Sequence, residues 1–101
     1  MYTDAKIKEE IPGNEQAVIY VYGKYKNVVY FEALSFLKSD SEAEVFTQDF
    51  LINFIYGERG IRKFDPQRSS LNTYLRLRLR SELKTQLSRS KREKERQVEY
   101  S

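Results

Sequence analysis

The sequence predicts a mainly helical domain, and the length of the chain and two segments with helical periodicity support this prediction. A chain of 101 residues forms one domain at most, with room for one modest core. Residues 41–56 and the segment after residue 70 both repeat apolar residues at three and four positions. Glycine and proline residues punctuate the stretches between the helical segments, as expected for turns.

The first segment, residues 14–31, fits either a helix or a hairpin. Asn14 follows Pro12-Gly13 and is a suitable N-cap for a helix that carries an apolar series, namely Ala17, Val18, Val21, Tyr25, Val28 and Val29. Residues 18–22 and 27–31 are rich in β-forming side chains, and residues 23–26 suit a hairpin loop. Propensity alone slightly favours strands. Residues 1–13 read as a polar lead-in.

The second segment predicts a helix over residues 41–56. Residues 41–44, Ser-Glu-Ala-Glu, form a capping box, and Gly57 and Gly60 end the helix. The apolar face that we expect in the core consists of Ala43, Phe46, Phe50 and Phe54. The opposite face places two aliphatic residues among acids and amides: Glu44, Val45, Gln48, Asp49 and Ile52. Such a face is typical of protein docking, although isolated exposed aliphatic residues are also common on ordinary surfaces.

The third segment predicts a basic helix that begins after a loop over residues 57–70. Asp65-Pro66 forms the turn of this loop, and Ser69 or Ser70 can cap the helix. Leucines recur at a strict spacing of four, at Leu71, Leu75, Leu79, Leu83 and Leu87. On the side that we place opposite the leucines lie Tyr74, Arg78, Ser81 and Thr85, flanked by Arg80 and Lys84. From residue 88 onward the chain is mostly charged and suits a solvated helix, a loop or disorder.

The side chains of this helix suit binding to a nucleic acid. Its cations can neutralise phosphates, and Arg78 can present a guanidinium fork to a base edge. Tyr74 can stack on an unpaired base or pack in the core with its hydroxyl at the rim, and the sequence leaves both open.

The distribution of charge supports two surfaces with different partners. Residues 1–60 contain six Lys or Arg and ten Asp or Glu, whereas residues 61–101 contain twelve and five. The chain has no cysteine and no histidine, which excludes disulfides, zinc fingers and histidine-dependent triads. We find no phosphate-cradling glycine loop and no paired acidic motif, so we expect no enzyme, no metal and no cofactor. With no leader-like start and no long apolar run, we expect a cytoplasmic protein without a membrane partner.

Residues 15–92 resemble region 2 of the sigma-70 family of bacterial RNA polymerase sigma factors, most nearly the compact group that includes the extracytoplasmic-function factors. Residues 43–51, Ala-Glu-Val-Phe-Thr-Gln-Asp-Phe-Leu, are similar to the family's polymerase-docking helix. Residues 64–75, Phe-Asp-Pro-Gln-Arg-Ser-Ser-Leu-Asn-Thr-Tyr-Leu, are similar to its promoter-melting segment. The resemblance implies an all-α, compact three- to four-helix bundle, and it changes our expectation for residues 14–31 to a helix. We therefore expect a lead-in at 1–13, the helical domain at 14–92 and a charged tail at 93–101.

The resemblance also implies a function in transcription initiation. The docking helix would contact the β′ clamp helices of core RNA polymerase through Glu44, Val45, Gln48, Asp49 and Ile52. The third helix and the tail would recognise and melt the promoter −10 element and hold its non-template strand. The residues implied for DNA binding are Asn72, Tyr74, Arg76, Arg78, Arg80, Ser81, Lys84, Arg89, Lys91 and Arg92.

The chain departs from the family pattern at a few of these positions. Val45 stands where an aspartate is usual, and Tyr74 stands where tryptophan is commonest. No region 4 follows, so we expect either a fragment of a longer factor or a region-2-only subunit that works with a separate region 4 partner. An anti-sigma factor is a further partner that the resemblance allows. The alternative is a small helical adaptor that binds proteins and has no nucleic-acid role.

Overall fold

The computed structural model describes the backbone of residues 2–100 and the side chains of residues 2–89. Over this range the chain forms four α-helices and one short 3-10 helix, and it contains no strand. The elements are α1 (Asp4–Glu10), α2 (Glu15–Leu37), α3 (Asp40–Tyr56), η1 (Ile61–Lys63) and α4 (Leu71–Tyr100). The all-α prediction is confirmed, and the hairpin that propensity favoured for residues 18–31 is wrong.

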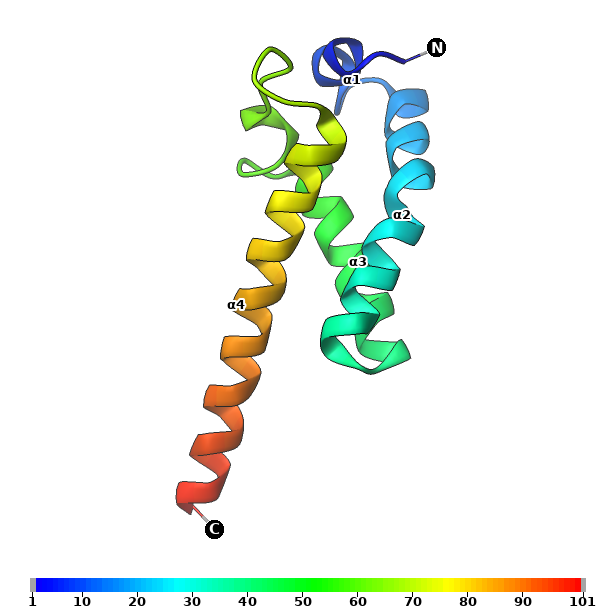
Figure 1. The fold of residues 1–101 in the computed structure, drawn as a ribbon. Coiled ribbons are helices and arrows are strands. Elements are labelled where there is room, and N and C mark those ends of the chain that lie inside the picture. Colours follow the sequence, from blue (N-terminus) through cyan, green and yellow to red (C-terminus); the bar gives the residue numbers. More distant parts are fainter. Residues whose placement is uncertain (1, 101) are drawn as a thin grey trace.

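The first two long helices, α2 and α3, form an antiparallel hairpin against which α4 packs (Figure 1). Asn14 caps α2 as predicted, since its side-chain oxygen accepts hydrogen bonds from the amides of Gln16 and Ala17. The buried residues of α2 recur every four positions, at Ala17, Val21, Tyr25, Val29 and Ala33. This spacing places the β-branched side chains on one helical face in the core, and their burial overrides their strand propensity.

The N-terminus of α3 differs from the prediction. Ser39, and not Ser41, is the N-cap, and its hydroxyl accepts a hydrogen bond from the amide of Glu42 at 3.4 Å. The turn is further fixed by Tyr30, which donates to the Asp40 carboxylate at 3.0 Å; this bond is the main reason that the pKa of Tyr30 is raised. The helix ends before Gly57, as predicted.

The aromatic face of α3 lies inward as expected, although not uniformly. Phe50 and Phe54 are buried, and Phe46 is half-buried. The ring centroids are 6.0 Å apart for Phe46 and Phe50 and 5.8 Å apart for Phe50 and Phe54, and both pairs are stacked. The three rings therefore form a continuous aromatic ladder along α3.

Helix α4 begins at Leu71 and carries the predicted leucine stripe into the core. The Ser70 hydroxyl accepts a hydrogen bond from the amide of Thr73 at 3.2 Å, which confirms Ser70 as the cap. The stripe is fully buried from Leu71 to Leu83, but Leu87 is 38 % exposed. The expectation of a core position for Leu87 is therefore wrong. Helix α4 itself continues past the turn that joins α2 to α3 (Figure 1). The backbone remains helical to Tyr100.

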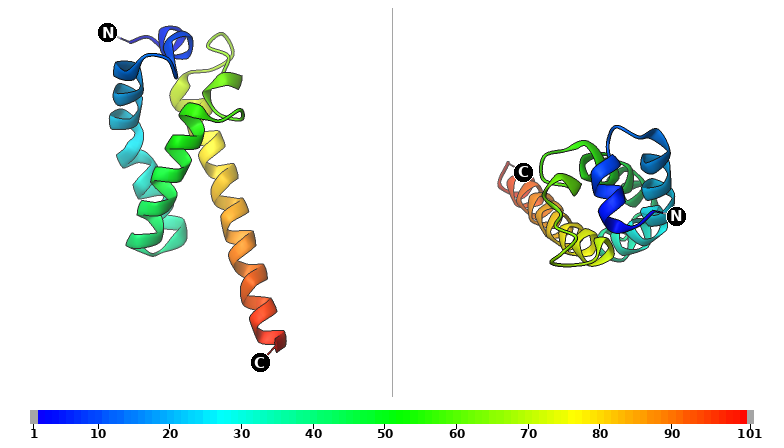
Figure 2. Two further views of the ribbon diagram at one scale, coloured as in Figure 1. Left: turned by 180° about the vertical axis from the view of Figure 1, so that it is seen from behind. Right: turned by 90° about the horizontal axis from the view of Figure 1, so that it is seen from above.

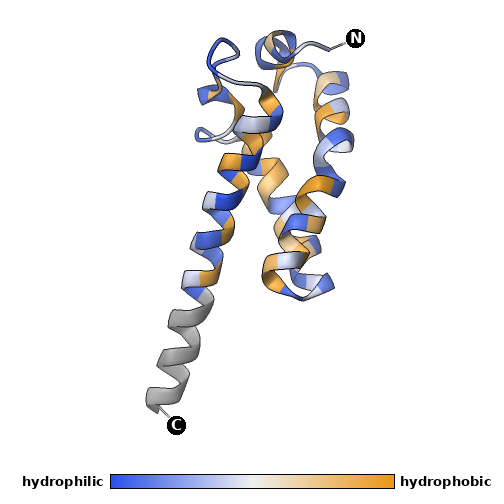
Figure 3. Cartoon of the chain, viewed as in Figure 1, coloured by the Kyte–Doolittle hydropathy of each residue, from blue (hydrophilic) through white to orange (hydrophobic). Residues whose placement is uncertain are grey.

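The segment that we expected as a polar lead-in contains a helix of the core. Helix α1 crosses the end of the bundle, above the starts of α2 and α4 (Figure 2), and buries Ile7 and Ile11. A helix of seven residues with one buried position gives too little periodicity to be recognised in the sequence. Figure 3 shows the general pattern, in which apolar residues recur along the helices between polar ones. No described helix is both long enough and apolar enough to cross a membrane.

The loop between α3 and α4 is packed rather than extended. Ile61 and Phe64 are buried, and the Asp65 side chain accepts a hydrogen bond from the amide of Gln67 at 3.0 Å, which closes the predicted turn. At Gly60 the loop passes so close to α3 that a Cβ atom would lie 2.0 Å from the backbone oxygen of Phe54. Only glycine fits at this position.

Gly60→Ala should therefore destabilise the protein by about 2 kcal/mol, because the loop must move away from α3 to admit the methyl group. Urea-induced unfolding monitored by circular dichroism measures this change. The matched control is Gly23→Ala, where a Cβ would meet nothing within 4 Å. Gly23 lies within α2, so the control should stabilise the protein by about 0.5–1 kcal/mol. Equal stability of the two variants would contradict the close approach.

Candidate nucleic-acid and protein interfaces

The described cations of α4 fall on three sides of the helix. Because each residue turns the helix by about 100°, a leucine stripe at spacing four leaves two flanks and an outer side. Arg76 and Arg80 lie on the flank next to α2, where both contact Glu32. Arg78 lies on the flank that faces α3, so the expectation that it lies opposite the leucines is wrong. The predicted DNA-binding residues Asn72, Ser81 and Lys84 are exposed.

Glu32 of α2 holds two of the predicted DNA-binding arginines. One carboxylate oxygen accepts a hydrogen bond from Arg80 Nε at 3.3 Å, and the other lies 3.9 Å from Arg76 Nη1. The Glu32 side chain is only 18 % exposed, so this carboxylate is partly shielded from water. Arg76 also donates to the side-chain oxygen of Asn72 at 3.2 Å. No local pattern pointed to Glu32, since 48 residues separate it from Arg80.

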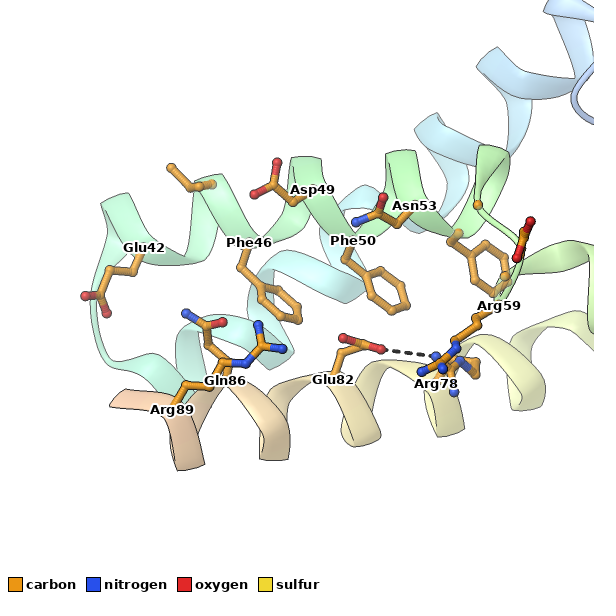
Figure 4. Close-up of a pocket in the computed structure, with 15 residues that line it drawn as sticks. Glu42, Phe46, Asp49, Phe50, Asn53, Arg59, Arg78, Glu82, Gln86 and Arg89 are labelled. Carbon is orange, nitrogen blue, oxygen red and sulfur yellow. Dashed lines mark hydrogen bonds and ion pairs between the residues drawn. The ribbon is translucent and has the colours of Figure 1, made fainter. Parts of the chain in front are cut away.

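The flank that faces α3 borders an open groove (Figure 4). Phe46 and Phe50 point into it from α3, and Arg78 and Glu82 lie on the α4 side. Arg78 donates to the Glu82 carboxylate at 3.1 Å. Arg89 and Arg59 also line the groove, as do the exposed docking candidates Val45 and Asp49. Charged side chains of both signs thus flank an aromatic floor, an arrangement that was not predicted from the sequence.

Tyr74 packs within the bundle. Its hydroxyl donates to the backbone oxygen of Gly60 at 2.8 Å, and its ring centroid lies 5.4 Å from that of Phe64 and 5.9 Å from that of Phe54. The expectation that Tyr74 lies opposite the leucines is therefore wrong, because a residue three positions after Leu71 lies beside it on the helix surface. Stacking of this ring on a base stays a prediction, and it requires the ring to leave these contacts.

The outer face of α3 has the composition that we predicted for docking. Glu44, Gln48 and Asp49 are exposed, and Val45 and Ile52 are 60 % and 51 % exposed. Tyr56, which is also 51 % exposed, follows Ile52 by one helical turn. We did not include Tyr56, although its spacing of four from Ile52 was a usable signal. The outer face of α3 is defined below as Glu44, Val45, Gln48, Asp49, Ile52 and Tyr56.

Three predicted DNA-binding residues lie toward the end of α4. Arg89 is exposed and lines the groove. The side chains of Lys91 and Arg92 lie outside the residues whose side chains the structure describes, although the backbone there is helical.

Comparison with known proteins identifies the family of this chain. A family model described as Sigma-70 region 2 matches residues 21–93. Searches of curated proteins and of solved structures gave no match. The matched range contains α3, the loop after it, α4 as far as residue 93 and most of α2. Because the match covers well over half of the chain and includes both surfaces, the chain belongs to the Sigma-70 region 2 family, which is non-enzymatic and whose members serve in promoter recognition.

Proposed function

We propose that this chain docks on core RNA polymerase through the outer face of α3 and recognises and melts the promoter −10 element through α4 and the loop before it. The observation that carries the proposal is the shared groove. Val45 and Asp49 of the docking face and Arg78 and Arg89 of the basic helix line the same groove. Polymerase and DNA bound to these two surfaces would therefore be neighbours, as a promoter complex requires.

The docking half of the proposal rests on the chemistry of α3. Gln48 and Asp49 offer an amide and a carboxylate beside the exposed aliphatic side chains of Val45 and Ile52. Interfaces combine apolar contact with a polar rim in this way. We assign the β′ clamp helices as the partner, and the valine at position 45 gives one polar contact fewer than the aspartate usual in the family.

The DNA half rests on cations that can exchange partners. Arg80, Lys84 and Arg89 are exposed to solvent. Arg76 and Arg80 form ion pairs with Glu32, and Arg78 forms an ion pair with Glu82. Surface ion pairs of this kind contribute about 0–1 kcal/mol each. Phosphates of the non-template strand can therefore displace the carboxylates. We also propose that the chain belongs to the compact, extracytoplasmic-function-like group and acts in the cytoplasm, on the basis of the motif at residues 64–75.

The internal pairing of these arginines favours one alternative, a helical adaptor that binds only proteins. The two functions differ in nucleic-acid binding at low salt, where phosphate contacts are strongest. Binding must be tested on the complex with core RNA polymerase as well as on the free chain. Absence of DNA binding in both would favour the adaptor.

Substituting Gln48→Ala together with Asp49→Ala should weaken binding to bacterial core RNA polymerase at least about 30-fold, as expected for central interface residues. Pull-down and biolayer interferometry with core enzyme, and with the isolated β′ clamp coiled coil, measure the loss. The matched control is Glu9→Ala with Gln16→Ala, an exposed acid and amide on α1 and α2. Binding by the α3 variant at the wild-type level would contradict the docking assignment.

Glu32→Gln should strengthen binding of the polymerase-bound chain to DNA roughly threefold, because the carboxylate no longer competes with phosphates for Arg76 and Arg80. Fluorescence anisotropy at several salt concentrations measures the affinity and its salt dependence. The control is Glu15→Gln, an identical change of charge at an exposed position of the same helix. Weaker binding by Glu32→Gln would show instead that the carboxylate holds the arginines in their binding geometry.

A further inference from the structure

We infer that α1 is a positioning element for the segment between Phe64 and Leu71, and that its two polar contacts set the efficiency of promoter opening. The inference rests on the proposed function, because this segment contains the motif similar to the family's promoter-melting segment. Helix α1 lies outside the residues that the family model matches, which begin at residue 21. The residues with which α1 makes these contacts, Asp4 and Lys8, are therefore not covered by the family model.

The first contact holds the start of α4. Asp4 accepts a hydrogen bond from the backbone amide of Leu71 at 2.9 Å, across 67 residues of sequence. The first amides of a helix have no partner within the helix, and a carboxylate near them is favoured by the helix dipole. Ser70 satisfies the amide of Thr73, so Asp4 and Ser70 together cap α4. One of the two caps is thus supplied by a distant helix.

The second contact holds the other end of the segment. The Lys8 ammonium donates a hydrogen bond to the backbone oxygen of Phe64, whose side chain is fully buried. Between these two anchors the turn is largely exposed, and Arg68 presents its side chain to solvent. Helix α1 therefore fixes both ends of a solvent-facing turn.

The two anchors act from one rigid face of α1. Asp4 and Lys8 are four residues apart, and Ile7 lies between them on the same face of the helix. Ile7 is only 1 % exposed, so it fixes α1 on the core. A short helix held in this way can transmit its position to both ends of the turn at once.

This geometry predicts an effect on opening rather than on binding. The cations assigned to phosphate contact all lie on α4, after the anchor at Leu71. The ion pairs of Arg76, Arg78 and Arg80 are with Glu32 of α2 or Glu82 of α4, and not with α1. Opening a duplex requires the turn and the start of α4 to be in place before the strands separate, and such preorganisation lowers the cost of the step. Loss of the anchors should therefore slow opening while leaving affinity for an already opened promoter unchanged.

The test uses the full chain with core RNA polymerase and a promoter duplex selected with the wild-type protein from a randomised pool. The duplex carries 2-aminopurine in its −10 region, so that fluorescence reports strand opening. Asp4→Ala with Lys8→Met should slow opening about tenfold, as expected for the loss of two hydrogen bonds. Its affinity for the same promoter with a pre-melted bubble should stay within about twofold of wild type.

The matched control removes the same groups from exposed positions of α1, through Lys6→Met with Glu9→Ala, and should open DNA at the wild-type rate. Asp4→Asn keeps an acceptor oxygen and should restore part of the rate lost in Asp4→Ala. Both single variants are measured as well, so that a double variant that fails to fold by circular dichroism does not decide the outcome.

The outcomes separate the two proposals. Opening at the wild-type rate by folded anchor variants would overturn the role of α1 and leave the proposed function intact. An equal loss of affinity for duplex and pre-melted promoter would also overturn it, because α1 would then serve binding in general. Absence of opening by the wild-type chain with polymerase would overturn both proposals.

Discussion

Burial of the α4 leucine stripe is the constraint on which the rest of the structure depends. Four leucines from Leu71 to Leu83 are fully buried, and each contributes about 1.5–3 kcal/mol by removal from water. Since a spacing of four advances the stripe by about 40° per repeat, the stripe winds around the helix. This winding determines which arginines face Glu32 on α2 and which face the groove beside α3. The charged surface is therefore arranged by the apolar core beneath it.

The loop after α3 connects the core to both surfaces. Gly60 allows the backbone to approach Phe54, and its own carbonyl accepts the Tyr74 hydroxyl. Phe64 then closes the space between the loop and α4. The same few contacts fix the loop, the start of α4 and the aromatic ladder. Loss of any one of these contacts should therefore displace the residues that line the groove. The interface residues thus depend on packing that lies several ångströms behind them.

Local signals in the sequence were sufficient for the approximate extent of α3 and for the N-caps of two of the three long helices, Asn14 for α2 and Ser70 for α4. They failed where the deciding interaction is distant in sequence. Residues 18–31 form a helix because their burial outweighs strand propensity, and Glu32 pairs with arginines more than forty residues away. The packing of Tyr74 in the bundle was missed because its position beside Leu71, three residues earlier, was overlooked. The cap at Ser39 was missed because Ser39 and Ser41 are each followed by a glutamate three residues later, and both therefore fit a capping box. Helix α1 was missed because it is short and because its polar partners, Phe64 and Leu71, lie 56 and 67 residues away in the sequence.

The contacts of α1 with residues more than 50 positions away imply that α1 is fixed late in folding. A helix of seven residues is not stable in isolation, because the free-energy cost of nucleation exceeds the gain from the few hydrogen bonds that so short a helix forms. The α2–α3 hairpin contains the more local contacts and can form as soon as it leaves the ribosome. Helix α1 gains its two polar anchors only after residue 71 has been synthesised and α4 has begun. Helix α1 is translated before α2 and α3 but is fixed after them, and the polar contacts that position the turn form late in the folding reaction.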